Sequence, residues 1–278
     1  MNNADTISVI MACHNCEATL ERALDSILEQ TYSNWFMICC DDGSDDRSYD
    51  ILLDYKRRYP DRFLILHNEE NKHLPYSLNR CLEYVTTDLV ARMDGDDQSL
   101  PERFEKQLRF LREHPECDLV GTGVRISNGS KIIGEIIRPP APEKEELIRS
   151  LPFSHATIMT YKRVYDQLGG YSPDPSVLRV EDLELWFRFF AQGFCGRNLT
   201  DMLYMIVEDR AAIKKRTLRG RINGVKVCWR GYRMLGFRKW VYLLPLVSIV
   251  KGLLPIRLYQ LLHTLSLRRT LKQGSDKR

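Results

Sequence analysis

Short apolar runs alternate with segments of helical periodicity through the first hundred residues. The runs are rich in β-branched side chains, which is typical of strands buried on both faces of a parallel sheet. Between them, apolar residues recur at helical spacing, as Leu20, Ala23, Leu24, Ile27 and Leu28 do. The predicted strands are 6–12, 35–40, 63–67 and 89–93, and the predicted helices are 20–28, 49–59 and 75–85. This alternation predicts an α/β fold, a right-handed, doubly wound, mostly parallel sheet covered by helices on both faces.

The second half of the pattern predicts that the sheet becomes mixed. Asn128-Gly129 separates two apolar runs within 118–137, which favours a β-hairpin. The proline-rich stretch 138–143 is expected to be a linker or surface loop. A strand at 157–161 and an amphipathic helix that starts at Glu181-Asp182 follow. Acids in a first helical turn also suit the helix dipole, so stabilisation alone can explain that pair.

Composition and charge bear on the number of domains and on how charge is distributed along the chain. At 278 residues, with 44% hydrophobic and 28% charged residues, the chain suits one large domain or a domain with an appendage, and this composition disfavours a mainly disordered chain. The N-terminus lacks the basic and apolar regions of a secretory signal, so none is expected. Residues 211–278 contain 17 Lys and Arg and one acid, a net charge of +16, which leaves −12 for residues 1–210 because the whole chain carries +4.

The eight cysteines include one C-x-x-C pair, Cys13 and Cys16, placed after the first predicted strand. This pair can be a redox dithiol, half of a zinc site, or an unreactive pair in a loop. A long chain without an expected export signal favours reduced thiols. No second pair has zinc-like spacing, and Cys39 and Cys40 are adjacent in a predicted strand, so they face opposite ways. The unreactive reading is favoured.

Three polar loops, 13–17, 41–46 and 94–97, follow predicted strands. Ligands of doubly wound sheets bind at the carboxyl ends of strands. The last two loops bring at least six carboxylates to one edge, where they would repel one another without a cation. Asp94 and Asp96 can ligate Mg²⁺ or Mn²⁺, which prefer carboxylate, diphosphate and water oxygens. A solvated turn is the alternative for this D-x-D sequence.

Asp42, at the end of the second strand, can accept the N3–H of uracil, a donor that cytosine lacks. The alternative is an Asx-turn cap in an ordinary turn. The chain has neither a G-x-x-x-x-G-K-[ST] nor a G-x-G-x-x-G motif. Phosphate neutralisation is therefore expected to come from a metal.

Five motifs follow one another along the chain: 7-ISVIMACHN-15, 38-ICCDDGSDD-46, 92-RMDGDDQSLPERFEKQLRFL-111, 153-FSHATIM-159 and 181-EDLELWFRF-189. On these motifs the chain resembles the family 2 glycosyltransferases of GT-A fold, and most of all bacterial enzymes that build O-antigen or exopolysaccharide repeat units. The resemblance covers about residues 6–210 and predicts a GT-A domain over 1–210; the charge pattern adds a basic helical extension over 211–278. The resemblance also makes Cys13 and Cys16 incidental members of the first nucleotide-binding loop.

The resemblance also implies roles for residues of the donor half. Asp42 matches the acid that contacts uracil, and Asp94 and Asp96 match the pair that holds ribose and the divalent cation. Asp97 extends that pair as a further candidate. The nucleotide is expected to be lined by Ala12, His14 and Asn15, although many relatives have Tyr in place of His14.

In the acceptor half, Asp182 matches the catalytic base, and Glu181 and Trp186 are expected to line the acceptor site. His155 is either an acceptor-site residue or a satisfied core histidine. The implied reaction is inverting transfer of a hexose or N-acetylhexosamine from a UDP-sugar to a saccharide acceptor, which we expect to be polyprenyl-diphosphate-linked, with Mn²⁺ or Mg²⁺ as cofactor.

Two other classes of function share parts of this pattern. A sugar nucleotidyltransferase also uses a doubly wound sheet and acidic metal ligands, but it should carry a glycine-rich loop with Arg and Lys after the first strand, and 12-ACHNCEA-18 has neither. A non-enzymatic nucleotide-sugar binder is disfavoured by the complete set of acids.

The basic extension interleaves its cations with Trp229, Tyr232, Phe237, Trp240 and Tyr242. Its longest uncharged run, 240–250, has 11 residues, short of the roughly 20 that a spanning helix needs. Amphipathic helices on an anionic membrane are expected instead, placing the protein peripherally at the cytoplasmic face of the inner (plasma) membrane. The positive charge can also meet a polyprenyl diphosphate. A solvated helical face and polyanion binding are the alternatives, but without a known nucleic-acid motif we expect no nucleic acid partner.

Overall fold

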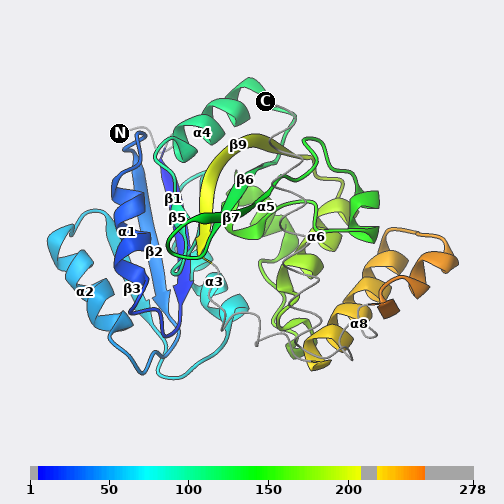
Figure 1. Ribbon diagram of the computed structural model, residues 1–278, viewed down its shortest axis with the longest axis horizontal. Coiled ribbons are helices and arrows are strands. Elements are labelled where there is room, and N and C mark those ends of the chain that lie inside the picture. The colour runs from blue at the N-terminus through cyan, green and yellow to red at the C-terminus, as the bar shows by residue number, and fades with distance from the viewer. Residues whose placement is uncertain (1–5, 208–217, 248–278) are drawn as a thin grey trace.

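A computed structural model of the chain describes residues 6–207 and 218–247. Within them, nine strands form one mixed sheet in the order β3-β2-β1-β4-β8-β6-β9-β5, with β7 paired to β6 (Figure 1). The strands are β1 (Ile7–Cys13), β2 (Trp35–Asp41), β3 (Phe63–His67), β4 (Leu89–Asp94), β5 (Gln98–Ser99), β6 (Leu119–Ser127), β7 (Ile132–Ile136), β8 (Met159–Tyr161) and β9 (Gly196–Val207).

Helices occupy most of the connections between these strands. The α-helices are α1 (Leu20–Leu28), α2 (Ser48–Arg58), α3 (Leu74–Glu83), α4 (Arg103–Glu113), α5 (Lys162–Leu168), α6 (Glu181–Ala191) and α8 (Leu218–Met234). Short 3-10 helices are η2 (Lys144–Ile148), η3 (His155–Thr157), η4 (Pro175–Val177) and η5 (Lys239–Leu243).

Strand β1 lies at the centre of a parallel unit with β2, β3 and β4, as the apolar runs predicted. Val9 and Met11 pack into one hydrophobic cluster, and Ile10 and Ala12 pack into a second. Because successive strand residues point to opposite faces, a strand covered on both sides is apolar at nearly every position, as β1 is except at Ser8. The doubly wound arrangement is thus confirmed.

Beyond β4 the sheet becomes mixed, as expected. Strand β8 is antiparallel to β4, and the hairpin at Asn128-Gly129 joins β6 to β7. The 12-residue strand β9, parallel to β6, was missed because Asn198, Thr200 and Asp201 interrupt its apolar pattern. The side chain of Asn198 donates to the carbonyls of Pro139 and Pro152 at 2.8 and 2.9 Å. These tertiary contacts accommodate a polar residue within the sheet.

Helix α8 packs against α6 at the end of the molecule opposite α2 (Figure 1). The rings of Tyr232 and Phe187 meet edge to face at 5.7 Å, and a Cβ on Gly231 would come within 2.1 Å of Phe187. The glycine therefore permits a close helix contact. In the described part of the chain no helix is long and apolar enough to cross a membrane. The predicted boundary at residue 210 lies outside the described residues.

Candidate active site

The two acidic loops leave the sheet at the same edge. Strand β1 lies between β2 and β4, and its register pairs Cys13 with Asp41 and Ala12 with Asp94. The carboxyl ends of these three parallel strands therefore lie side by side. This is the edge at which doubly wound sheets bind ligands.

Three carboxylates gather in the turn after β4. Asp94, Asp96 and Asp97 each offer an oxygen atom within 4.8 Å of the others. Asp97 is buried, and loss of water, followed by the charges of Asp94 and Asp96, raises the pKa of its carboxyl well above the ordinary range. Hard oxygen donors in mutual repulsion suit a divalent cation such as Mg²⁺ or Mn²⁺. These residues thus fit the expected metal.

Gly95 packs the turn against the first loop. A Cβ on Gly95 would lie 3.1 Å from the Cβ of Cys13, and its carbonyl accepts a hydrogen bond from Thr19 Oγ1 at 3.0 Å. The glycine therefore allows the turn to lie close to the loop that carries Cys13 and Cys16. Burial raises the pKa of Cys13 well above its usual value and that of Cys16 to about 11, which disfavours thiolate chemistry at either position.

Arg92 ties the acidic turn to strand β4. It is two residues before Asp94, so the two side chains leave the strand on the same face. Its Nη2 lies 2.6 Å from Asp94 Oδ1, and its Nη1 donates to Oδ2 at 2.9 Å. Arg92 is 3% exposed, and its buried Nε has no hydrogen-bond partner within the described residues. Sequence reasoning missed this residue, although its i, i+2 spacing to Asp94 could have indicated the pair.

Asp41 and Asp46 of the second acidic loop accept hydrogen bonds from nearby groups. Asp41 Oδ2 lies 2.9 Å from His67 Nδ1, and Asp41 also accepts from the Ser44 N–H at 3.2 Å. Asp46 accepts from the N–H groups of Glu17 and Ser48 at 3.0 and 2.9 Å. Among the described residues, the candidate metal cluster contains only the acids of 94–97, so a cation shared between the two loops stays a prediction.

His14 and Asn15 of the first loop (13–17) contact the second loop (41–46). His14 Nδ1 lies 3.0 Å from the carbonyl oxygen of Asp42, and the Asn15 side chain accepts from the Asp45 N–H at 2.9 Å. Asn15 has φ of +54°, a left-handed conformation that asparagine tolerates better than most residues. Ala12 is buried at the end of β1. Contacts between these residues and a nucleotide stay a prediction.

Asp42 is held by a network that sequence reasoning did not find. Its Oδ1 accepts from Asn68 Nδ2 at 2.7 Å, from the Lys72 N–H at 2.9 Å and from Ser77 Oγ at 2.8 Å. Three donors on one oxygen fix the orientation of the whole carboxylate. The signal that could have indicated these partners is the polar segment after β3, since β3 is parallel to β2 and ends at the same edge.

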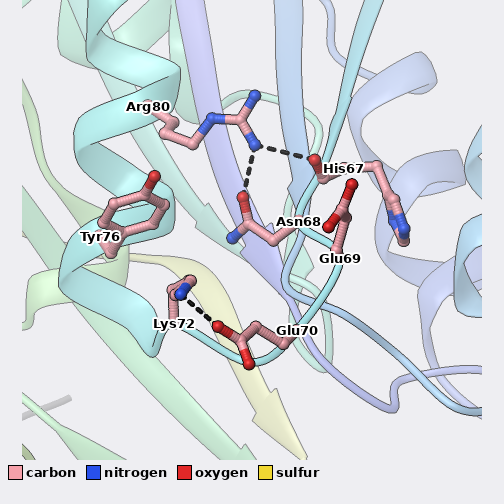
Figure 2. Close-up of a pocket in the computed structure, with 7 residues that line it drawn as sticks. All are labelled: His67, Asn68, Glu69, Glu70, Lys72, Tyr76 and Arg80. Carbon is pink, nitrogen blue, oxygen red and sulfur yellow. Dashed lines mark hydrogen bonds and ion pairs between the residues drawn. The ribbon is translucent and has the colours of Figure 1, made fainter.

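A pocket of about 550 Å³ adjoins this network. Figure 2 shows it between α3, which carries Tyr76 and Arg80, and the segment that follows β3. Arg80 donates to the carbonyl of His67 at 2.8 Å and to the side chain of Asn68, the same residue that donates to Asp42. The lining residues are His67, Asn68, Glu69, Glu70, Lys72, Tyr76 and Arg80. A polar pocket thus lies next to the fixed carboxylate.

Asp182 occupies the first turn of α6, half-buried, and its Oδ1 accepts from the Leu183 N–H at 2.7 Å. Burial is the largest influence on the pKa of its carboxyl and raises it above the ordinary value. The Leu183 N–H and the charges of Arg92 and Arg138 act in the opposite direction. Arg92, which pairs with Asp94, is thus one of the charges that favour the deprotonated form of Asp182.

Of the remaining acceptor-site candidates, Trp186 is buried, whereas His155 and Glu181 are half-buried like Asp182. Trp186 is 1% exposed and its ring packs against Phe153 at 5.0 Å, so the structure places it in the core. His155 Nε2 lies 2.7 Å from the hydroxyl of buried Tyr171, and burial holds the pKa of this histidine well below its usual value. These contacts favour the satisfied core histidine. Glu181 keeps a buried oxygen that lacks a partner within the described residues, and burial raises the pKa of its carboxyl.

Known proteins match both the sequence and the fold. The family model for glycosyl transferase family 2 matches residues 8–184. The chain is 38% identical over 263 residues to the putative glycosyltransferase EpsE of Bacillus subtilis, covering 95% of each chain. It is 34% identical over 190 residues to the O-antigen biosynthesis glycosyltransferase WbnJ of Escherichia coli, covering 66% of this chain and 71% of that one.

A solved structure supports the fold independently of sequence. The mannosyltransferase PcManGT of Pyrobaculum calidifontis, in complex with GDP-Man and Mn²⁺, aligns with a TM-score of 0.67 at 16% identity. The alignment covers 87% of this chain and 71% of that one. The expected GT-A fold is confirmed, and the protein belongs to family 2 of the glycosyltransferases.

Proposed function

We propose that this glycosyltransferase moves a hexose or N-acetylhexosamine from a UDP-sugar to a saccharide acceptor, with inversion at the anomeric carbon. The acceptor is a polyprenyl-diphosphate-linked saccharide, and the product enters O-antigen or exopolysaccharide synthesis at the cytoplasmic face of the plasma membrane. The observation that carries the proposal is the cluster of Asp94, Asp96 and Asp97, at the same edge of the sheet as the fixed carboxylate of Asp42.

The choice of UDP rests on Asp42. Three donors hold its Oδ1, and Oδ2 is the oxygen we assign to the N3–H of uracil. A related fold binds GDP-Man in PcManGT, so the fold alone leaves the base open. We therefore assign selection of the nucleobase to the fixed carboxylate of Asp42 and to the pocket beside it.

The acidic turn holds the diphosphate end of the donor. Asp96 and Asp94 would hold a divalent cation, with Asp97 behind them. When bound, this cation supplies positive charge that stabilises the leaving nucleoside diphosphate. Arg92 pairs with Asp94. We assign Asp96 as the principal metal ligand and Asp94 to the ribose, as the family resemblance implies.

Asp182 acts as the base. Its carboxylate takes the proton of an acceptor hydroxyl while that oxygen bonds to the anomeric carbon and the bond to the diphosphate oxygen breaks. Attack opposite the leaving group inverts the anomeric configuration. A carboxyl whose pKa is raised by burial is a stronger base than an exposed one, which suits this role. Similarity to WbnJ supports a place in O-antigen-type synthesis.

The test is a donor panel. The full chain is incubated with UDP-sugars and Mn²⁺, with GDP-mannose as the matched control donor, and UDP or GDP release is measured with and without a lipid-linked saccharide acceptor. We expect acceptor-dependent UDP release and none of GDP. A product that keeps the α configuration of an α-linked donor, determined by NMR, would refute the inverting assignment.

Family membership removes the sugar nucleotidyltransferase alternative. A non-enzymatic nucleotide-sugar binder is the remaining alternative from the sequence. Such a protein would bind UDP-sugars in the same panel without releasing UDP in the presence of any acceptor.

A further inference from the structure

One side of α8 faces solvent and combines apolar with basic side chains. Ile222, Lys226, Trp229 and Arg233 follow one another at spacings of three and four residues, so they share one side of the helix. All four are exposed, whereas Val225 and Tyr232 are buried on the side that faces the domain. The solvent-exposed side of α8 therefore presents apolar and basic side chains together.

The segment after α8 continues this surface with larger apolar groups. Trp240 is 60% exposed and Leu243 is 67% exposed, next to the exposed cations Arg238 and Lys239. Residues 218–247 contain seven Lys and Arg and no Asp or Glu. We call this the α8–η5 surface; its members are Ile222, Lys226, Trp229, Arg233, Met234, Arg238, Lys239, Trp240, Leu243, Leu244 and Val247.

The α8–η5 surface is fixed to the catalytic domain next to the proposed base. A Cβ on Gly224 would lie 3.6 Å from Val180, the residue that precedes α6 and its Asp182. Arg230 pairs with Asp174 at 2.8 Å, and Trp229 Nε1 donates to the carbonyl of Tyr242 at 2.9 Å. The orientation of the surface relative to the site is therefore defined by packing and polar contacts.

We propose that the α8–η5 surface binds an anionic phospholipid bilayer. Exposed Trp, Leu and Val side chains gain from entering the boundary between headgroups and acyl chains, and the surrounding cations are attracted to anionic headgroups. A polynucleotide offers charge but no apolar phase for Leu243 and Val247. If the acceptor is lipid-linked, which rests on the proposed function, this contact brings its membrane anchor to the side of the domain where α6 begins.

The first experiment measures sedimentation of the full chain with phosphatidylcholine vesicles that contain or lack phosphatidylglycerol. We expect binding only to the anionic vesicles, weakening with salt. The Arg238→Gln, Lys239→Gln pair should weaken binding about thirtyfold at low salt, since each cation contributes about 1 kcal/mol. The Trp240→Ser, Leu243→Ser pair should weaken it about tenfold or more.

The matched control changes an exposed leucine and an exposed arginine at the other end of the molecule, Leu53→Ser with Arg57→Gln on α2 (Figure 1). It should bind vesicles like the unmodified chain. Wild-type binding by both α8–η5 variants would overturn the proposal. Equal loss in the control, or retention on an RNA column without vesicle binding, would overturn it too.

A second measurement does not depend on affinity. With vesicles whose acyl chains carry bromine, tryptophan fluorescence should be quenched, and Trp240→Phe should remove much of the quenching while Trp35→Phe leaves it, because Trp35 is buried. Quenching unchanged by Trp240→Phe would contradict insertion of this side chain. Asp182→Asn should bind vesicles normally, so that a failure of the enzymatic proposal is distinguishable from a failure of this one.

Discussion

Arg92 and Asp94 form a bidentate ion pair at the end of β4, with Nη2–Oδ1 and Nη1–Oδ2 distances of 2.6 and 2.9 Å. Arginine is buried in this pair and Asp94 is partly exposed. The planar guanidinium therefore positions Asp94 from the buried side, while the Asp94 carboxylate remains partly accessible to solvent.

Replacement of Arg92 tests this positioning. Arg92→Lys keeps the charge but cannot make two parallel hydrogen bonds, so we expect the fold to persist and kcat/KM to fall about tenfold or more. Arg92→Met leaves Asp94 unpaired and should lower the free energy of unfolding by about 1–3 kcal/mol, below the range for a fully buried pair because Asp94 meets solvent. Thermal unfolding and donor kinetics measure the two effects.

The control is Arg58→Lys, which alters an exposed ion pair with Asp54 on α2. It should leave unfolding and kinetics unchanged. Normal kcat/KM in Arg92→Lys would show that two-point contact with Asp94 is dispensable.

Asp96→Asn tests the metal site. Removing one of three clustered carboxylates should weaken Mn²⁺ binding at least tenfold, measured by calorimetry without donor, because one hard anionic ligand is lost. Chelation of metal from the unmodified chain should likewise abolish UDP release. Asp45→Asn changes an exposed acid of the second loop and should bind Mn²⁺ normally. Equal weakening in both variants would contradict a site confined to 94–97.

The elements around the site were predictable because their signals are local. Apolar runs and helical spacing indicated β1, β4 and α6, and the rule that parallel strands end at one edge brought Asp42 and Asp94 together. The pairing of Arg92 with Asp94 also follows from strand geometry. The sequence does not show, however, whether an arginine inside an apolar run is buried in the sheet or exposed at the edge of the sheet.

The partners of Asp42 and the course of β9 could not be read from periodicity. Asn68 comes from the segment after β3 and Ser77 from α3, and only the folded chain shows that their donors converge on one oxygen. Asn198 is accommodated in β9 because carbonyls of distant prolines accept its hydrogen bonds. Periodicity also did not show that Trp186 is buried, and its role at the acceptor site stays a prediction.

Asp42→Asn tests base selection. The amide can keep its oxygen toward Asn68, Lys72 and Ser77 and place its NH₂ where we assign the uracil N3–H. Two donors then face each other, so UDP affinity should fall about tenfold to a hundredfold, while CDP, whose N3 accepts, should gain. Calorimetric titration with both nucleotides measures the ratio. An unchanged UDP-to-CDP preference would remove Asp42 from base recognition.

Asp182→Asn tests the base. An amide cannot take the proton from the acceptor, so turnover should fall about a hundredfold to ten-thousandfold, while the Kd for UDP stays within about twofold. The control on the same helix is Glu184→Gln, whose carboxylate pairs with Arg188. Near-normal turnover in Asp182→Asn would refute the assignment.

The pH dependence of turnover distinguishes a base from a binding residue. Asp182 must be deprotonated to act, and burial raises its pKa. The acidic limb of the kcat profile should therefore lie at a higher pH than the pKa of an ordinary aspartate, which is about 3.9. The charge of Arg138 lowers the pKa of Asp182. In Arg138→Gln this influence is lost, the pKa of Asp182 rises further, and the acidic limb should move to higher pH while kcat at its plateau is retained.

The control is Arg163→Gln, at an exposed arginine that pairs with Asp118, and it should leave the acidic limb in place. A limb that stays fixed in Arg138→Gln would mean that some other group titrates.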